Sequence, residues 1–281
     1  MEFVNTEQAA YWAGRAKSWS AQEAVHDRVI GPAGRMAMER LDPRPGQVLV
    51  DLGCGTGQTT VELARRVGPG GQVVGVDIAA AMFERARQHL GDAGVGNVEL
   101  VHADVQSTNL GQGRFDGAYS RFGVMFFSDP VAAFSNVHAS LKSGAALSFA
   151  CWQPLQANDW MSVPAQAAIA VLDVVPEMPA PDAPGPFALA EPEAMRRVLD
   201  AAGFCDIDIA FHDDFLMAPE TGISEMADAA LQVGAVQRML ENADPKTVEL
   251  ARQAIVDALE SRLVNAEVAL SRAFLLVRAV A

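Results

Sequence analysis

The chain has 281 residues, 50% of them hydrophobic, and a formal net charge of −14. Its length and apolar content allow one large core, and its acidic balance argues against nucleic acid or an anionic membrane as partner, because both bind cationic faces. The three scattered cysteines suggest neither a disulfide framework nor a metal site, and no signal-peptide or membrane-span pattern is present, so we expect a cytoplasmic protein.

Residues 1–46 are predicted to form a helical cap ahead of the first strand. An apolar stripe at helical spacing includes Tyr11, Trp12 and Trp19, and it is interrupted at Gly31 and Pro32. The prolines and the glycine within residues 43–46 then predict a turn into the strand.

An apolar strand with a glycine-rich end follows at residues 48–57, with the sequence VLVDLGCGTG. Glycine tolerates positive φ and lets the backbone approach a ligand closely. The carboxylate of Asp51 stands two places before the first glycine. This pattern is shared by several nucleotide-binding folds.

Three more predicted strands end in polar residues. Residues 72–77 end at Asp77, whose carboxylate can accept hydrogen bonds from both hydroxyls of a ribose. Residues 98–102 lead to Asp104, which is placed to accept from an exocyclic adenine amine. Residues 115–120 end at Ser120 and lead directly to Arg121. The four strand ends together predict an adenosine site at one edge of a sheet.

Helices are predicted between these strands at residues 59–67, 80–90 and 129–141, and a fifth strand at residues 145–152. Such alternation predicts a doubly wound, mostly parallel α/β sheet with ligands at the carboxyl ends of its strands. We expect residues 47–152 to form this Rossmann-like core.

The alternation stops after Trp152. Residues 153–190 are predicted to be a loop or lid insertion, because five prolines between residues 176 and 186 exclude a helix or a central strand. Residues 191–281 are predicted to complete the sheet, with a helix at 191–202 and strands at 204–215 and 272–279. Between those strands, a helical insertion over about residues 223–264 is predicted to contain two helices that part at Asp244 and Pro245. We expect this insertion to act as a lid or as an oligomer contact.

These motifs resemble those of the class I S-adenosylmethionine-dependent methyltransferases that modify small molecules. The resemblance implies a seven-stranded sheet, mostly parallel, with an antiparallel carboxyl-terminal strand. It implies that the glycines bed the methionine part of the cofactor, that Asp51 lies near its amine, that Asp77 holds the ribose and that Asp104 faces adenine. The cofactor contacts implied in this way are Asp51, Gly53, Gly55, Thr56, Gly57, Gln58, Thr59, Asp77, Ile78, Met82, Ala103, Asp104, Val105, Ser120, Arg121 and Phe122.

The resemblance further implies methyl transfer from S-adenosyl-L-methionine to a small molecule, with S-adenosyl-L-homocysteine as the second product. Transfer from a sulfonium is an in-line displacement, and holding donor and acceptor in line can supply about 7–11 kcal/mol. A general base is needed only where the acceptor must lose a proton. The candidate bases are His26 and Tyr11.

Aromatic residues gather near the carboxyl edge of the predicted sheet. They suggest a pocket for a hydrophobic or aromatic acceptor, formed by Trp12, Trp19, Phe126, Trp152 and Trp160. The alternative is that these side chains fill the core.

Arg121 is the cation nearest the predicted site. Its guanidinium either binds an acidic acceptor through two hydrogen bonds or forms a surface ion pair with Asp116 or Asp129. Of these two roles we favour the ion pair.

Two other functions are compatible with a glycine-rich strand end. A nicotinamide-dependent oxidoreductase would need the spacing G-x-G-x-x-G, whereas Gln58 follows Gly57 here. A protein of the same fold can also bind the cofactor without transferring its methyl group. The sequence leaves open which atom of the acceptor is methylated and whether the chain is a monomer or a homodimer.

Overall fold

The computed structural model describes residues 3–172, 183–232 and 234–281. Its contacts divide the chain into two compact units. Unit 1 comprises Met1–Trp152, Asp182–Phe211 and Phe274–Ala281, and unit 2 comprises Gln153–Pro181 and His212–Ala273. Most of the predicted proline-rich loop falls at residues 173–182, outside the described residues.

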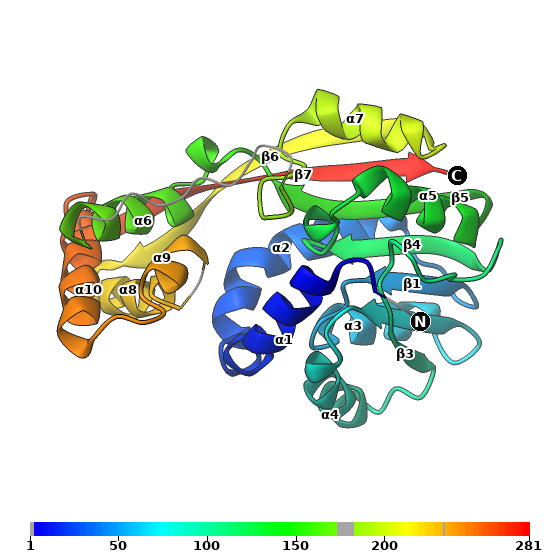
Figure 1. The fold of residues 1–281 in the computed structure, drawn as a ribbon, viewed down its shortest axis with the longest axis horizontal. Helices are drawn as coiled ribbons and strands as arrows, with labels where there is room; N and C mark the ends of the chain where they lie inside the picture. The colour runs from blue at the N-terminus through cyan, green and yellow to red at the C-terminus, as the bar shows by residue number, and fades with distance from the viewer. Residues whose placement is uncertain (1–2, 173–182, 233) are drawn as a thin grey trace. The chain divides into compact units, whose positions relative to one another are not determined.

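A seven-stranded sheet has the strand order β3-β2-β1-β4-β5-β7-β6 (Figure 1). The neighbouring strands among β1 to β5 pair in parallel, and β7 runs antiparallel to β5. This arrangement confirms the predicted fold class, including the reversed strand at the carboxyl end. The strands are β1 (Val48–Leu52), β2 (Gln72–Asp77), β3 (Val98–His102), β4 (Phe115–Arg121), β5 (Leu141–Trp152), β6 (Cys205–Pro219) and β7 (Glu267–Val280).

The helical cap breaks at a different place from the predicted one. Helix α1 (Thr6–Ala21) ends and α2 (Glu23–Leu41) begins on either side of Gln22, and α2 continues through Gly31 and Pro32. A proline inside a helix costs about 3 kcal/mol. The buried face of α2 packs against β4 and β5, and this tertiary packing outweighs the local cost.

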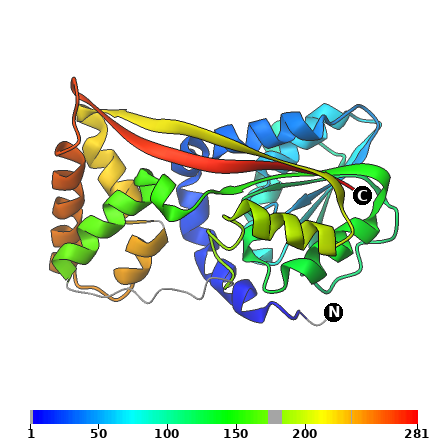
Figure 2. The same cartoon turned by 90° about the horizontal axis from the view of Figure 1, so that it is seen from above.

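Helices cover both faces of the sheet within unit 1 (Figures 1 and 2). On one face lie α2 and α3 (Gln58–Val67), with α4 (Phe83–Ala93) packed beside α3, and on the other lie α5 (Pro130–Ser140) and α7 (Pro192–Ala201). Strand β1 is almost entirely buried between them, as expected for a strand covered on both sides. The doubly wound layering places the carboxyl ends of β1 to β4 at one edge, where the predicted site residues lie.

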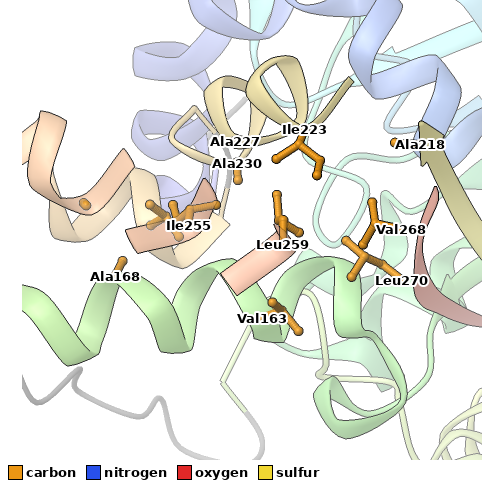
Figure 3. Close-up of a cluster of buried hydrophobic side chains, with 12 residues drawn as sticks. Val163, Ala168, Ala218, Ile223, Ala227, Ala230, Ile255, Leu259, Val268 and Leu270 are labelled. Carbon is orange, nitrogen blue, oxygen red and sulfur yellow. The ribbon is translucent and has the colours of Figure 1, made fainter. Parts of the chain in front are cut away.

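Unit 2 is built around a small aliphatic core (Figure 3). In that view Ile223, Ile255 and Leu259 lie close together between the helices that carry them. Asp244 caps the last helix by accepting from the backbone nitrogens of Lys246 and Thr247, as the sequence predicts. Within its described residues the insertion holds one helix more than the predicted pair, and a further helix lies in the segment predicted as a loop or lid. The helices are α6 (Asp159–Leu172), α8 (Ile223–Ala230), α9 (Gly234–Met239) and α10 (Pro245–Glu260).

Candidate functional site

The loop after β1 holds three glycines in the left-handed region, with φ of 69° at Gly53, 54° at Gly55 and 80° at Gly57. A Cβ added at Gly53 would lie 3.0 Å from the Cα of Gly123, and one at Gly57 would lie 3.0 Å from the Cβ of Ala86. A Cβ at Gly55 would meet no atom within 4 Å. The loop is therefore packed tightly at both ends and leaves open space beside its middle glycine.

Asp51 is fully buried near the end of β1. Its Oδ2 accepts hydrogen bonds from the hydroxyls of Thr59 at 2.8 Å and Thr60 at 2.7 Å, and its Oδ1 has no partner among the described residues. Burial raises the pKa of Asp51 to about 6, although the two hydroxyls act in the opposite direction. An ammonium group would supply the missing partner, so Asp51 fits the amine of the cofactor. Thr60, which the sequence did not single out, therefore helps to hold this carboxylate in place.

Asp77 ends β2 and is also buried. One of its oxygens accepts from the backbone nitrogen of Gly55 and the other from that of Ala79, both at 2.8 Å. Burial raises the pKa of this carboxyl as well, against those hydrogen bonds. An ionised carboxylate has about four acceptor positions, so two remain for the hydroxyls of a ribose. The residue fits the role that the resemblance implies.

Asp104 lies just beyond β3 and is 1% exposed. Its Oδ2 accepts from the backbone nitrogens of Val4 at 3.1 Å and Asn5 at 2.9 Å, and its Oδ1 accepts from that of Gln106 at 3.0 Å. About one acceptor position remains on Oδ1, enough for one amine hydrogen. The segment ahead of α1 is therefore fixed against the residue predicted to face adenine.

Arg121, at the end of β4, is bonded to Asp27 of α2 at 3.2 Å and to the side-chain oxygen of Gln58 at 3.0 Å. The predicted ion pair with Asp116 or Asp129 is wrong, because those carboxylates make other contacts. The helix α2 packs against β4 and brings Asp27 within reach of the guanidinium, a contact between residues 94 positions apart that local spacing does not reveal.

Ser120 and Phe122, on either side of Arg121, make different contacts. The buried hydroxyl of Ser120 donates to the carbonyl of Leu52 at 2.7 Å, so it joins β4 to β1. Phe122 has a φ of 58°, rare for a bulky residue, and its ring stacks on Trp152 at 4.2 Å.

The remaining residues predicted to contact the cofactor lie around the same strand ends. Met82, Ala103 and Val105 are buried. The carbonyls of Thr56 and Ile78 bond the rings of His89 at 2.8 Å and His102 at 3.0 Å, respectively.

Several of the residues predicted to bind the methyl acceptor form a row of aromatic rings in unit 1. The ring of Trp12 lies edge-on to Phe126 at 4.9 Å and to Trp19 at 5.5 Å, and Trp19 stacks on His26 at 3.9 Å. Trp12 and Trp19 also pack on a buried cluster that contains the cofactor-side residues Cys54, Ala79 and Met82. Trp160 belongs to unit 2, where its indole nitrogen donates to Asn158 at 3.1 Å and its ring packs on the aliphatic core.

The two candidate bases have different surroundings. Neither ring nitrogen of His26 reaches hydrogen-bond geometry with a described residue. Burial and then the charge of Arg121 lower the pKa of His26 to about 4, so its imidazole is neutral at pH 7. The ring of Tyr11 is covered by the guanidinium of Arg15, 3.9 Å from the ring centre.

Metal-binding clusters and membrane-spanning helices are both absent from the described residues. Among these residues no three His, Cys, Asp or Glu side chains form a group suited to a metal ion. None of the helices described is both long and apolar enough to cross a bilayer.

Comparison with known proteins identifies the family. Residues 49–144 match a family model described as a methyltransferase domain. The nocamycin O-methyltransferase of Saccharothrix syringae is 30% identical over 195 residues, which are 67% of this chain and 70% of that protein.

Two solved structures show a similar fold. The YcgJ protein of Bacillus subtilis has a TM-score of 0.58 at 14% identity, covering 89% of this chain and 98% of that one. The [4+2]-cyclase SpnF has a TM-score of 0.52 at 18% identity, covering 88% of this chain and 78% of that one. The glycine loop and the unpartnered Oδ1 of Asp51 are consistent with these matches. The chain belongs to the class I S-adenosylmethionine-dependent methyltransferases.

Proposed function

We propose that the protein transfers a methyl group from S-adenosylmethionine to a small hydrophobic or aromatic molecule by in-line displacement. When bound, the cofactor supplies an electrophilic methyl group on a sulfonium. One relative supports a small-molecule acceptor, because the nocamycin O-methyltransferase by its name methylates nocamycin. The observation that supports this most is the group of aromatic side chains at the ends of β4 and β5, where Phe122 stacks on Trp152 and Phe126 lies against Trp12.

The chain's own contribution is alignment. Asp51 and Asp77 are held rigidly by hydroxyls and backbone nitrogens, so their free acceptor positions point in fixed directions. The tight loop at Gly53 and Gly57 sets the distance of the backbone from the ligand. Such fixed positioning converts donor and acceptor into a nearly unimolecular pair, which is the largest effect available for a displacement that needs little charge stabilisation.

A strong general base is not part of this proposal. A base with a pKa near 4 is poorly matched to the proton of a phenol, so the neutral imidazole of His26 is unsuited to deprotonate such an acceptor. An acceptor that is already anionic, such as a carboxylate or an acidic phenol, needs no base.

The test is transfer of a labelled methyl group from S-adenosylmethionine to a panel of small phenols and aromatic carboxylic acids. Phe126→Ala removes a half-buried ring after β4, and we expect it to lower kcat/KM for the acceptor while changing the cofactor Kd by less than about twofold. Phe211→Ala, at a ring that is 62% exposed, is the matched control and should change neither value. Equal losses of acceptor use and cofactor affinity in Phe126→Ala would contradict the assignment.

The rival function is cofactor binding without methyl transfer. It is supported by the likeness of fold to a protein described as a [4+2]-cyclase. The same assay separates the two, because the rival predicts tight cofactor binding with no labelled product from any acceptor.

A further inference from the structure

The helix α1 crosses the ends of two strands that hold the cofactor residues. At its beginning, the backbone of Val4 and Asn5 donates to Asp104 beyond β3. Further along, Trp12 and Trp19 pack on Ala79 and Met82, which follow β2. The helix thus lies over the end of the site where adenine and ribose are expected.

The first turn of α2 is tied to the other end of the site. Glu23 accepts two hydrogen bonds from Arg85 of α4, at 3.0 and 2.8 Å, and lies 3.2 Å from His89. The same His89 bonds the carbonyl of Thr56 in the glycine loop. Together with the Asp27 to Arg121 contact at 3.2 Å, this fixes α2 above the loop and the start of α3.

The face of these helices that is turned inward carries polar atoms with no partner. They are shielded from solvent, and none of them makes a hydrogen bond with a described residue. These atoms are Gln8 Oε1, Gln22 Oε1, Glu23 Oε1 and both ring nitrogens of His26. A buried acceptor left without a partner is costly, so such atoms bond water or a ligand.

The chemistry of these atoms matches the cofactor. S-adenosylmethionine presents donors in its amine and its ribose hydroxyls, and the unpartnered oxygens are acceptors. We propose that α1 and the first turn of α2 form a cofactor-binding lid, in which Gln8, Gln22 and His26 bind polar groups of S-adenosylmethionine directly. This assignment concerns the cofactor alone and does not depend on which acceptor is methylated.

The first test is calorimetric titration with S-adenosylhomocysteine. Gln22→Met and Gln8→Met keep the length of the side chain and remove its acceptor, and His26→Phe keeps the ring stacked on Trp19 and removes its nitrogens. Each should raise the Kd roughly 5- to 30-fold, the range expected for one buried hydrogen bond. Gln253→Met, on the exposed surface of α10, is the matched control and should bind like the wild type.

A second measurement follows the local opening of α1 by its cleavage with trypsin. Trypsin cuts at Lys17 and Arg15 of α1 only when the helix opens locally, so S-adenosylhomocysteine should slow cleavage there at least about tenfold. Gln22→Met should lose much of this protection at the same ligand concentration.

Two results would overturn the lid. One is binding that is unchanged in all three folded variants, which would assign the buried atoms to water. The other is cleavage of α1 that is unaffected while the ligand binds. Thermal melting checks that each variant is folded, and the three substitutions are independent of one another. A protein that methylates nothing but shows these binding losses would contradict the proposed function and leave the lid intact.

Discussion

The two units of the chain treat their buried polar groups differently. In unit 2, Asn158 exchanges hydrogen bonds with the backbone of Ala273 at 2.9 and 3.0 Å, and Arg272 bonds both oxygens of Asp214. In unit 1, by contrast, lie all eight buried side-chain atoms that lack a partner within the described part of the chain.

This difference is what a ligand site in unit 1 would predict. A folded protein tolerates a buried, unpartnered acceptor chiefly where water or a ligand completes it. Most of the unpartnered atoms of unit 1 belong to Asp51 and to the inward face of α1 and α2, beside the strand ends that hold the cofactor residues. Unit 2 depends for its stability on small aliphatic side chains packed together.

The largest expected effect comes from a substitution in the core of unit 2, which tests whether that unit contributes to cofactor binding. Ile255→Ala deletes part of a fully buried side chain, and we expect it to lower the free energy of unfolding by about 2–5 kcal/mol. Urea unfolding measures this loss. The cofactor Kd of the protein that remains folded should stay within about twofold of the wild type, and a Kd that rises with the loss of stability would show that unit 2 contributes to the binding site.

A substitution in the glycine loop should greatly weaken cofactor binding and reduce the stability of the fold only slightly. Gly55→Val places a side chain in the open space beside the loop, so we expect the Kd for S-adenosylhomocysteine to rise at least about 100-fold. The positive φ should cost the fold only about 1–2 kcal/mol. Gly222→Ala in unit 2, with φ of −93°, is the control that should leave both binding and stability nearly unchanged. Wild-type affinity in Gly55→Val would mean that the ligand lies elsewhere.

Asp77→Asn tests whether this carboxylate binds the ribose of the cofactor. The amide keeps the shape of the side chain but loses the charge that strengthens its hydrogen bonds, so we expect roughly 10- to 100-fold weaker binding. Isothermal calorimetry with adenosine as a competing ligand localises the effect. Adenosine should lose as much affinity as S-adenosylhomocysteine, and a loss confined to the longer ligand would place Asp77 at the methionine part instead.

The pH dependence of binding tests Asp51. Burial raises its pKa to about 6, so the carboxylate is ionised above that pH and becomes protonated as the pH falls through 6. Because only the ionised form pairs with the cofactor's ammonium, affinity should fall roughly tenfold between pH 7 and pH 5. Asp51→Asn should bind more weakly at pH 7 and show no such dependence. An unchanged pH profile in that variant would assign the titration to another group.

Local sequence was sufficient to predict the strand ends of unit 1 at which we place the cofactor. The glycines, Asp51, Asp77 and Asp104 follow predicted strands at fixed spacing, and the doubly wound topology brings those strand ends together. The spacing of residues along one strand and turn decides these positions, so no distant contact is needed to find them.

The contacts of the helical cap could not be predicted in the same way. The helix break at Gln22, the bond of Glu23 to Arg85 and the pairing of Arg121 with Asp27 depend on how α2 packs, and the bonded residues lie 62 and 94 positions apart. Tertiary packing also carries α2 through Pro32, which local propensity alone predicts as a break. The buried side-chain oxygen of Gln8 could not be predicted, because a glutamine in a helix usually faces solvent.

The most direct test of the account is calorimetric titration of the wild-type protein with S-adenosylhomocysteine, beside Asp77→Ala and with nicotinamide adenine dinucleotide in parallel. We expect one micromolar site per chain for S-adenosylhomocysteine, loss of that site in the variant and no binding of the dinucleotide. A folded wild-type protein that binds only the dinucleotide, or that binds S-adenosylhomocysteine equally well without Asp77, would contradict the assignment of the strand ends of unit 1 as the cofactor site.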